Sequence, residues 1–272
     1  MNIVIFDTET TNLEKPFCYN IGYAIFNTDA AEIVLKKDYV VEQVWHNPML
    51  FTTAYYADKR DIYVGRMRSR QCRMDKFGYI TQAMYRDIKE YDIQHAFAYN
   101  SSFDEKVFTF NCDWFKCINP LEMVQVHDIR GQVHKKIAFT ESYKNFCEKH
   151  ELFTDTGNYS TTAEAGYRYV SGEVDFIEEH TALADALIEL EILRYCVNLG
   201  TEWEADYKTY RTIPRIEMKE MEIVDAEGIS HKFPYTNRTK LRGADGFRLS
   251  IKEKMRSVRH WRTFFVGGHL DV

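Results

Sequence analysis

The chain opens with an apolar run that predicts a buried β-strand almost at its first residue. Residues 2–6 (NIVIF) are β-branched or aromatic apart from one asparagine, and comparable runs follow at 20–26 and 32–41. Such short runs between polar segments are typical of strands. Because only short connections separate them, we predict three successive antiparallel strands.

Farther along the chain, strands alternate with helices. Residues 95–99 predict a strand, and residues 104–109 and 142–150 predict helices. The strongest helical signal runs from Glu178 to Asn198, where leucines recur near a 3.6-residue spacing before Gly200. Together these elements predict an α/β domain with a mixed sheet up to about residue 198.

Residues 47–90 have a different character, with aromatic and basic side chains mixed in a stretch that we expect to be helical. Four arginines gather between Arg66 and Arg73. Arginines beside aromatic rings can follow a phosphate backbone and stack on unpaired bases. The alternative is a solvated helical face, and the sequence leaves both open.

Composition narrows the class of protein. The 272 residues are 45% hydrophobic and 28% charged, which excludes collagen-like, low-complexity and wholly disordered chains. No run approaches the roughly 20 apolar residues of a membrane span. Six scattered cysteines show no zinc-ligand spacing, so reduced thiols are expected. We therefore expect a cytoplasmic protein with no membrane partner.

The formal net charge of -6 hides an uneven distribution. From residue 231 to the end, ten Lys or Arg stand against three acidic residues, so the preceding part is strongly acidic. A basic segment on an acidic body suggests a polyanionic partner. A solvated basic face is the alternative interpretation.

Two carboxylates follow the first predicted strand. Asp7 and Glu9 are two residues apart, so their side chains point the same way if the extended backbone continues. Two negative charges at a buried sheet end are costly unless a cation neutralises them. Mg²⁺ and Mn²⁺ prefer such oxygen ligands. A turn or a helix-capping pair is the alternative.

Three further residues are candidates for the same chemistry. Asp104 lies where a strand gives way to a helix, a position equally suited to a helix N-cap. Asp185 has small and apolar neighbours in the long helix, which suggests a buried carboxylate that needs a partner. His180 precedes it by five residues and, taken alone, fits an ordinary surface or core histidine.

Taken together, three segments resemble a known family. They read FDTETTNL (6–13), NSSFD (100–104) and HTALADA (180–186). In order and context they resemble the three motifs of the DEDDh 3′→5′ exonucleases, the branch of the ribonuclease H-like superfamily that includes DnaQ-type proofreading subunits. The histidine five residues before the last aspartate separates this branch from the one that has tyrosine.

The resemblance covers residues 1–198 and implies a ribonuclease H-like mixed five-stranded sheet flanked by helices. The spacer between the first two motifs is longer than in compact relatives, which implies an insertion at about 47–90. Residues 199–272 would form a C-terminal extension, basic from about 231. This extension is a candidate site for nucleic acid or for a partner protein.

The resemblance also implies roles for single residues. Asp7, Glu9, Asp104 and Asp185 would hold two divalent ions, Mg²⁺ or Mn²⁺, and His180 would act as the general base. A second set would face the 3′-terminal nucleotide: Thr8, Thr10, Thr11, Asn12, Leu13, Asn100 and Phe103.

The expected activity is metal-dependent 3′→5′ hydrolysis of single-stranded or frayed DNA, releasing nucleoside 5′-monophosphates. An RNA-trimming enzyme or oligoribonuclease is a first alternative, because the motifs do not reveal whether the pocket admits a 2′-hydroxyl. A catalytically silent nucleic-acid-binding module is a second. It is less favoured because all four carboxylates and His180 are present.

Overall fold

The computed structural model describes residues 1–52, 54 and 57–216, together with four strands beyond them. The chain divides into two compact units, Met1–Ile213 and Pro214–Val272. In the second unit, β7 (Met218–Val224) pairs with β8 (Ser230–Thr236), and β9 (Lys240–Arg242) pairs with β10 (Arg248–Ser250), both antiparallel. The remainder of the basic segment that begins at residue 231 lies outside the described residues.

The first unit is built on one six-stranded mixed sheet in the order β4-β3-β2-β1-β5-β6. Strand β2 runs antiparallel to both of its neighbours, and the other three pairings are parallel. The strands are β1 (Asn2–Thr10), β2 (Cys18–Asn27), β3 (Glu32–Val41), β4 (Arg73–Asp75), β5 (His95–Ala98) and β6 (Gln125–Asp128). The predicted α/β class with a mixed sheet is confirmed.

The number of strands differs from the expected five. The additional strand, β4, lies in the stretch predicted to be helical and pairs in parallel with the end of β3, where Tyr39 faces Arg73. Three residues are too few to carry a period-2 signal. The strand forms because β3 offers an unpaired edge, which no local pattern in the sequence reveals.

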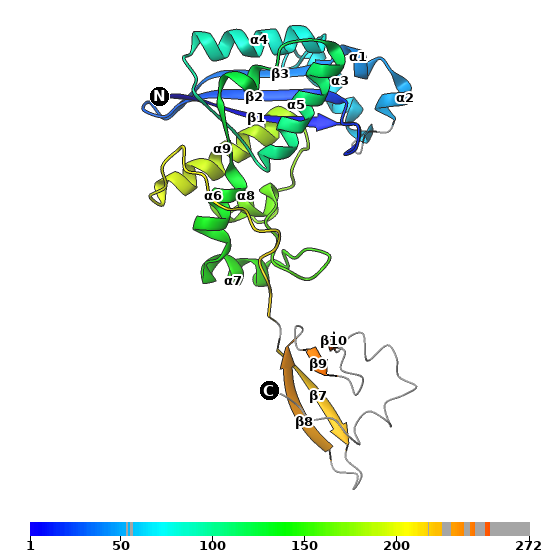
Figure 1. Ribbon diagram of the computed structural model, residues 1–272, viewed down its shortest axis with the longest axis vertical. Helices are drawn as coiled ribbons and strands as arrows, with labels where there is room; N and C mark the ends of the chain where they lie inside the picture. Colours follow the sequence, from blue (N-terminus) through cyan, green and yellow to red (C-terminus); the bar gives the residue numbers. More distant parts are fainter. Residues whose placement is uncertain are drawn as a thin grey trace. The chain divides into compact units, whose positions relative to one another are not determined.

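Helices cover both faces of the sheet, and the two faces have separate hydrophobic cores (Figure 1). Val4 and Phe6 face the core shared with α1 to α5, whereas Ile3 and Ile5 face the core shared with α6 to α9. This alternation is the period of an extended strand. The helices are α1 (Glu42–Trp45), α2 (Pro48–Phe51), α3 (Arg60–Arg68), α4 (Phe77–Glu90), α5 (Ser101–Phe115), α6 (Ile129–Val133), α7 (Glu141–Lys149), α8 (Ala163–Ser171) and α9 (Ala182–Asn198), with 3-10 turns at Ala57–Lys59 and Pro120–Met123 and a π turn at His134–Ala138.

None of the helices in the described part of the chain is both long enough and apolar enough to cross a membrane.

The long helix α9 begins at Ala182, four residues later than its predicted start at Glu178. His180 has a φ of +55°, in the left-handed region, so the chain is not helical there. The helix starts where Asn20 of β2 accepts a hydrogen bond from the backbone N–H of Ala182, at 2.8 Å. A residue 162 positions away in the sequence thus fixes this helix end.

Helix α9 crosses strand β2 so closely that only glycine fits at the crossing. A Cβ atom on Gly22 would overlap the backbone of Ala182 and Leu183. We expect Gly22→Ala to lower the free energy of unfolding by about 2 kcal/mol, because backbone atoms cannot rotate away as a side chain can. Denaturant unfolding followed by circular dichroism measures this change.

Gly65→Ala is the matched control for that substitution. Gly65 lies inside α3, and apart from its chain neighbours and the backbone of its own helix, no atom of the described residues lies within 4 Å of the position that a Cβ would take. Alanine is the better helix former, so this variant is expected to gain up to about 1 kcal/mol. Equal effects of the two substitutions would contradict the close crossing of α9 and β2.

Candidate active site

The sequence suggested that Asp7 and Glu9 come directly after the first strand. Strand β1 instead continues to Thr10, so both residues lie inside it. Asp7 pairs with Gly22 and Glu9 with Asn20 of β2. Both acids follow the odd-numbered positions of Ile3 and Ile5, which face α9. The strand therefore presents its two carboxylates toward the helix that carries Asp185.

Asp104 reaches the same sheet end from the other face. It lies in the first turn of α5 and is only 3% exposed. Thr8, which points opposite to Asp7 and Glu9, donates a hydrogen bond from Oγ1 to Asp104 Oδ1 at 2.6 Å. The N-cap position belongs to Asn100, so the capping alternative does not describe Asp104.

Helix α9 and the segment before it bring Asp185 and His180 to Glu9. One ligand atom from each of these three residues lies within 4.8 Å of the other two. Asp185 is 5% exposed, and its Oδ1 atom is buried with no hydrogen-bond partner among the residues that the structure describes. An unpartnered buried carboxylate oxygen is costly, and a bound cation would remove that cost.

The electrostatics of these groups also favour a bound cation. Burial, followed by repulsion from Glu178 and Glu9, raises the pKa of Asp185 to about 9. Burial likewise raises the pKa of Glu9 to about 8 and that of Asp104 to about 7. The pKa of Asp7 also rises, through burial and then the charges of Asp104 and Glu189.

The residues present fit a divalent metal. They supply several carboxylate oxygens, which are the preferred ligands of Mg²⁺ and Mn²⁺. The oxygen without a hydrogen bond, Asp185 Oδ1, belongs to the same cluster. A cation there would favour the ionised carboxylates that burial otherwise disfavours.

Two acidic residues that the sequence analysis did not identify also belong to the site. Glu189 lies one turn after Asp185, is 3% exposed, and accepts a hydrogen bond from the backbone N–H of Tyr99 at 3.1 Å. The pKa of Glu178 is raised to about 7 by burial and then by Glu164. Glu189 could have been found from the sequence, because it lies four residues after Asp185 on the same helix face. No sequence pattern indicates Glu178.

The segment after Asp7 forms the edge of the site. Thr8 is buried, and its hydroxyl donates a hydrogen bond to Asp104. Thr11 is also buried, and its backbone N–H donates a hydrogen bond to the carbonyl oxygen of Phe17. Thr10 is half-buried, and its Oγ1 lies 3.4 Å from the carbonyl oxygen of Asn12. Of these three threonines, Thr10 is the least buried.

The loop that follows is exposed and ordered by local hydrogen bonds. The side-chain oxygen of Asn12 accepts from the backbone N–H groups of Glu14 and Lys15. Leu13 is 72% exposed, and its carbonyl accepts a hydrogen bond from Lys106 of α5 at 2.8 Å. Leu13 therefore presents an apolar side chain to solvent.

The second motif contributes one exposed and one packed residue. Asn100 is exposed, has a φ of +63°, and donates its backbone N–H to Asp128 Oδ1 at 2.9 Å. Phe103 is half-buried and packs against the core shared with α5. The core interpretation of Phe103 and a contact through its exposed edge are both compatible with this placement.

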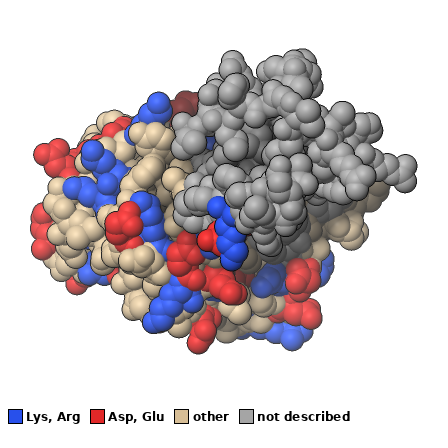
Figure 2. All heavy atoms as spheres, turned by 90° about the horizontal axis from the view of Figure 1, so that it is seen from below, with Lys and Arg blue, Asp and Glu red and all other residues tan. Residues whose placement is uncertain are grey.

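One face of the described part of the chain carries charges of both signs. On the face drawn in Figure 2, Lys and Arg side chains alternate with Asp and Glu side chains over the described residues. Arg68 and Arg70 of the predicted basic cluster are exposed, whereas Arg66 is mostly buried. The cluster is therefore not a uniform basic face.

Comparisons with known proteins give a structural resemblance only. No family model matches the chain, and no curated protein matches it. Solved structures that resemble it include Exonuclease I of E. coli in complex with a dA16 oligonucleotide, with a TM-score of 0.43 and 11% sequence identity. That alignment covers 72% of this chain, and this chain spans 41% of the length of that protein.

Proposed function

We propose that this protein is a metal-dependent 3′→5′ exonuclease that acts on single-stranded or frayed DNA. The observation that carries the proposal is the carboxylate cluster around Asp185, whose Oδ1 atom is buried without a hydrogen bond. The residues that would hold two divalent ions are Asp7, Glu9, Asp104 and Asp185. When bound, such ions stabilise the attacking and leaving oxygens of a phosphodiester displacement.

His180 is proposed as the general base. Its imidazole is placed beside Glu9 and Asp185, and burial and then the charge of Lys59 lower its pKa below the ordinary value. A lowered pKa keeps the imidazole neutral at pH 7, so a ring nitrogen can accept the proton of the attacking water. The carboxylates remain ionised ligands throughout and take no proton in this scheme.

The 3′-terminal nucleotide would lie along residues 8–13. Leu13 offers an exposed apolar surface for a base, and Thr10 offers a hydroxyl for the sugar. Asn100 and Phe103 would line the opposite edge. DNA is favoured over RNA as the substrate, and the product would be a nucleoside 5′-monophosphate.

The test is a comparison of labelled substrates. Purified protein is incubated with 5′-labelled and 3′-labelled single-stranded DNA and RNA, in Mg²⁺, Mn²⁺ or EDTA, beside an Asp7→Ala variant. We expect a ladder of shortened 5′-labelled DNA and early release of labelled mononucleotide from the 3′-labelled strand. EDTA and Asp7→Ala should each abolish both signals.

The outcomes separate the alternatives. Faster shortening of RNA than of DNA would favour the RNA-trimming alternative, with the same metal-dependent hydrolysis. Binding without hydrolysis on every substrate would favour the silent binding module. Activity that persists in EDTA or in Asp7→Ala would contradict the metal-dependent scheme.

A further inference from the structure

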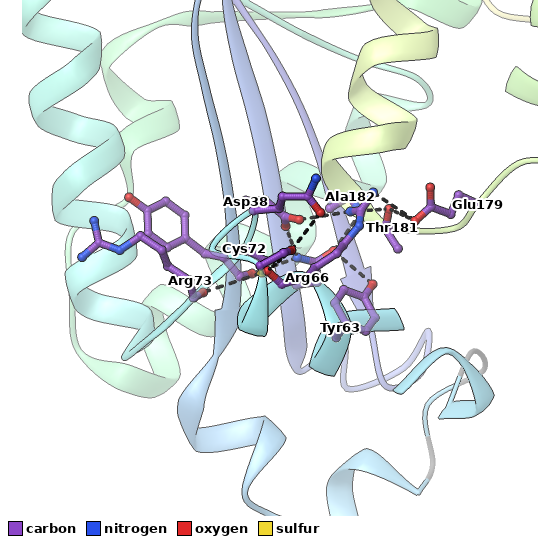
Figure 3. Close-up of polar contacts among 12 residues, drawn as sticks. Asp38, Tyr63, Arg66, Cys72, Arg73, Glu179, Thr181 and Ala182 are labelled. Atoms are coloured by element: carbon purple, nitrogen blue, oxygen red, sulfur yellow. Dashed lines mark hydrogen bonds and ion pairs between the residues drawn. The ribbon is translucent and has the colours of Figure 1, made fainter. Parts of the chain in front are cut away.

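The segment that carries His180 is held by an arginine from a distant helix. Arg66 of α3 donates from Nη1 to Thr181 Oγ1 at 2.9 Å, and its Nη2 lies 3.0 Å from Glu179 Oε1 (Figure 3). These two contacts lie immediately before and after His180. One guanidinium thus fixes both neighbours of the histidine.

The same arginine is itself anchored in the sheet. Its Nη1 lies 3.1 Å from Asp38 Oδ2 of β3, a carboxylate that is 1% exposed. Asp38 Oδ1 accepts a hydrogen bond from the side-chain amide of Asn20 at 2.7 Å. Asn20 in turn accepts hydrogen bonds from Tyr63 of α3 and from the backbone N–H of Ala182. The network therefore joins β2, β3 and α3 to the start of α9.

The backbone at His180 needs such support. A φ of +55° is uncommon for a residue with a side chain and costs free energy unless surrounding contacts enforce it. The contacts through Glu179, Thr181 and Ala182 fix the chain on both sides of this residue. Without them, we expect the segment to relax and the imidazole to leave its place beside Glu9.

We infer that Arg66 is a positioning residue that holds the His180 imidazole beside Glu9 and Asp185. This inference rests on the proposed function, in which His180 acts on the attacking water. It also gives a role to part of the stretch 47–90: helix α3 buttresses the site from within the protein. The guanidinium of Arg66 is directed at protein acceptors, so the phosphate-clamp interpretation does not fit this arginine.

The kinetic test compares Arg66→Ala, His180→Ala and the double variant, with 5′-labelled single-stranded DNA and Mn²⁺. We expect Arg66→Ala to lower kcat by about 100-fold and to change KM by less than about threefold, because misplacement of a catalytic group slows chemistry. In the His180→Ala background, the same substitution should cost less than about threefold. Arg66→Lys, which keeps the charge but loses the planar fork, should fall between.

Arg194→Ala is the matched control. Arg194 forms a surface ion pair with Glu191 on α9 at 2.7 Å. Its substitution therefore removes an arginine and an ion pair but leaves the contacts of the His180 segment in place. Its kcat should equal that of the wild type. If Arg66→Ala does not fold, Thr181→Val removes the contact next to His180 and keeps the Arg66–Asp38 pair; it should lower kcat by about tenfold.

A second readout does not depend on activity. The imidazole ¹H–¹⁵N correlations of His180, assigned by their loss in His180→Ala, should shift in Arg66→Ala and stay in place in Arg194→Ala. If the wild type cleaves no nucleic acid but these signals shift, the proposed function fails and the positioning of His180 stands. Unchanged His180 signals, or a raised KM with unchanged kcat in Arg66→Ala, would overturn the inference.

Discussion

Asp185→Asn is expected to lower kcat by about 10³-fold while leaving the fold intact. Asparagine has nearly the shape of aspartate but lacks the charge that a divalent ion needs, so the loss should fall on electrostatic stabilisation of the transition state. The same substitution removes a buried carboxyl whose pKa burial raises to about 9. We therefore expect the metal-free variant to be more stable than the wild type above neutral pH, by about 2 kcal/mol.

Two measurements check this prediction together. Single-turnover hydrolysis of labelled DNA gives the loss of rate, and urea unfolding in EDTA at pH 8 gives the gain in stability. Asp155→Asn is the control, because Asp155 is exposed in a loop and should change neither quantity. A variant with near-normal activity, or with lower stability than the wild type in EDTA, would contradict the role of Asp185.

His180→Ala separates two roles that the geometry permits for the histidine. Its ring lies close enough to Glu9 and Asp185 to share a metal with them or to act on a water beside it. If His180 is the base, stabilisation of the protein by Mn²⁺ should survive the substitution while turnover falls. Loss of that stabilisation would make His180 a ligand.

The stability of the metal-free protein should fall as the pH rises through the neutral range. Burial first, and in part neighbouring carboxylates, raise the pKa of Asp104 to about 7, of Glu9 to about 8 and of Asp185 to about 9. Their ordinary values are near 4, so between about pH 4.5 and 9 the folded state binds more protons than the unfolded state. The free energy of unfolding must then decrease with pH in this window.

The expected size of this effect is a loss of about 5 kcal/mol between pH 6.5 and 8.5, the linkage value for about two excess protons over that interval. Mn²⁺ or Mg²⁺ binds the deprotonated carboxylates, so stabilisation by the metal should grow over the same interval. Urea unfolding with and without metal at both pH values measures it. A metal effect of equal size at pH 6.5 and 8.5 would argue against these carboxylates as the ligands.

Asp185→Asn provides the control for the pH dependence as well. With one of the raised carboxyls gone, the dependence of stability on pH should be shallower and the metal should no longer stabilise the protein. The clustered carboxylates that the proposed function requires lower the stability of the metal-free protein, as is common where like charges are held together for a ligand.

Much of the fold could be predicted from local patterns. The first three strands follow from short β-branched runs, and the α9 segment follows from its apolar spacing, because burial on one face leaves a period in the sequence. The candidate metal ligands Asp7, Glu9, Asp104 and Asp185 were identified by a resemblance between motifs, and their roles stay predictions. The structure shows that β1 and α9 bring Glu9 and Asp185 together with His180.

Other features depend on contacts between segments that are far apart in the chain. Strand β4 exists because the edge of β3 accepts it, and α9 starts late because Asn20 holds the N–H of Ala182. The inward direction of Arg66 depends on Asp38 and on the residues beside His180.

By itself, the sequence determined the class of fold, the order of the motifs and the residue types that chemistry requires, since these depend on local period and composition. Only the tertiary structure decided which acids share one site, the late start of α9 and the direction of Arg66. The physical reason is that these features depend on contacts between segments far apart in the chain, such as Glu9 with Asp185 and Asn20 with Ala182, where no local pattern records them.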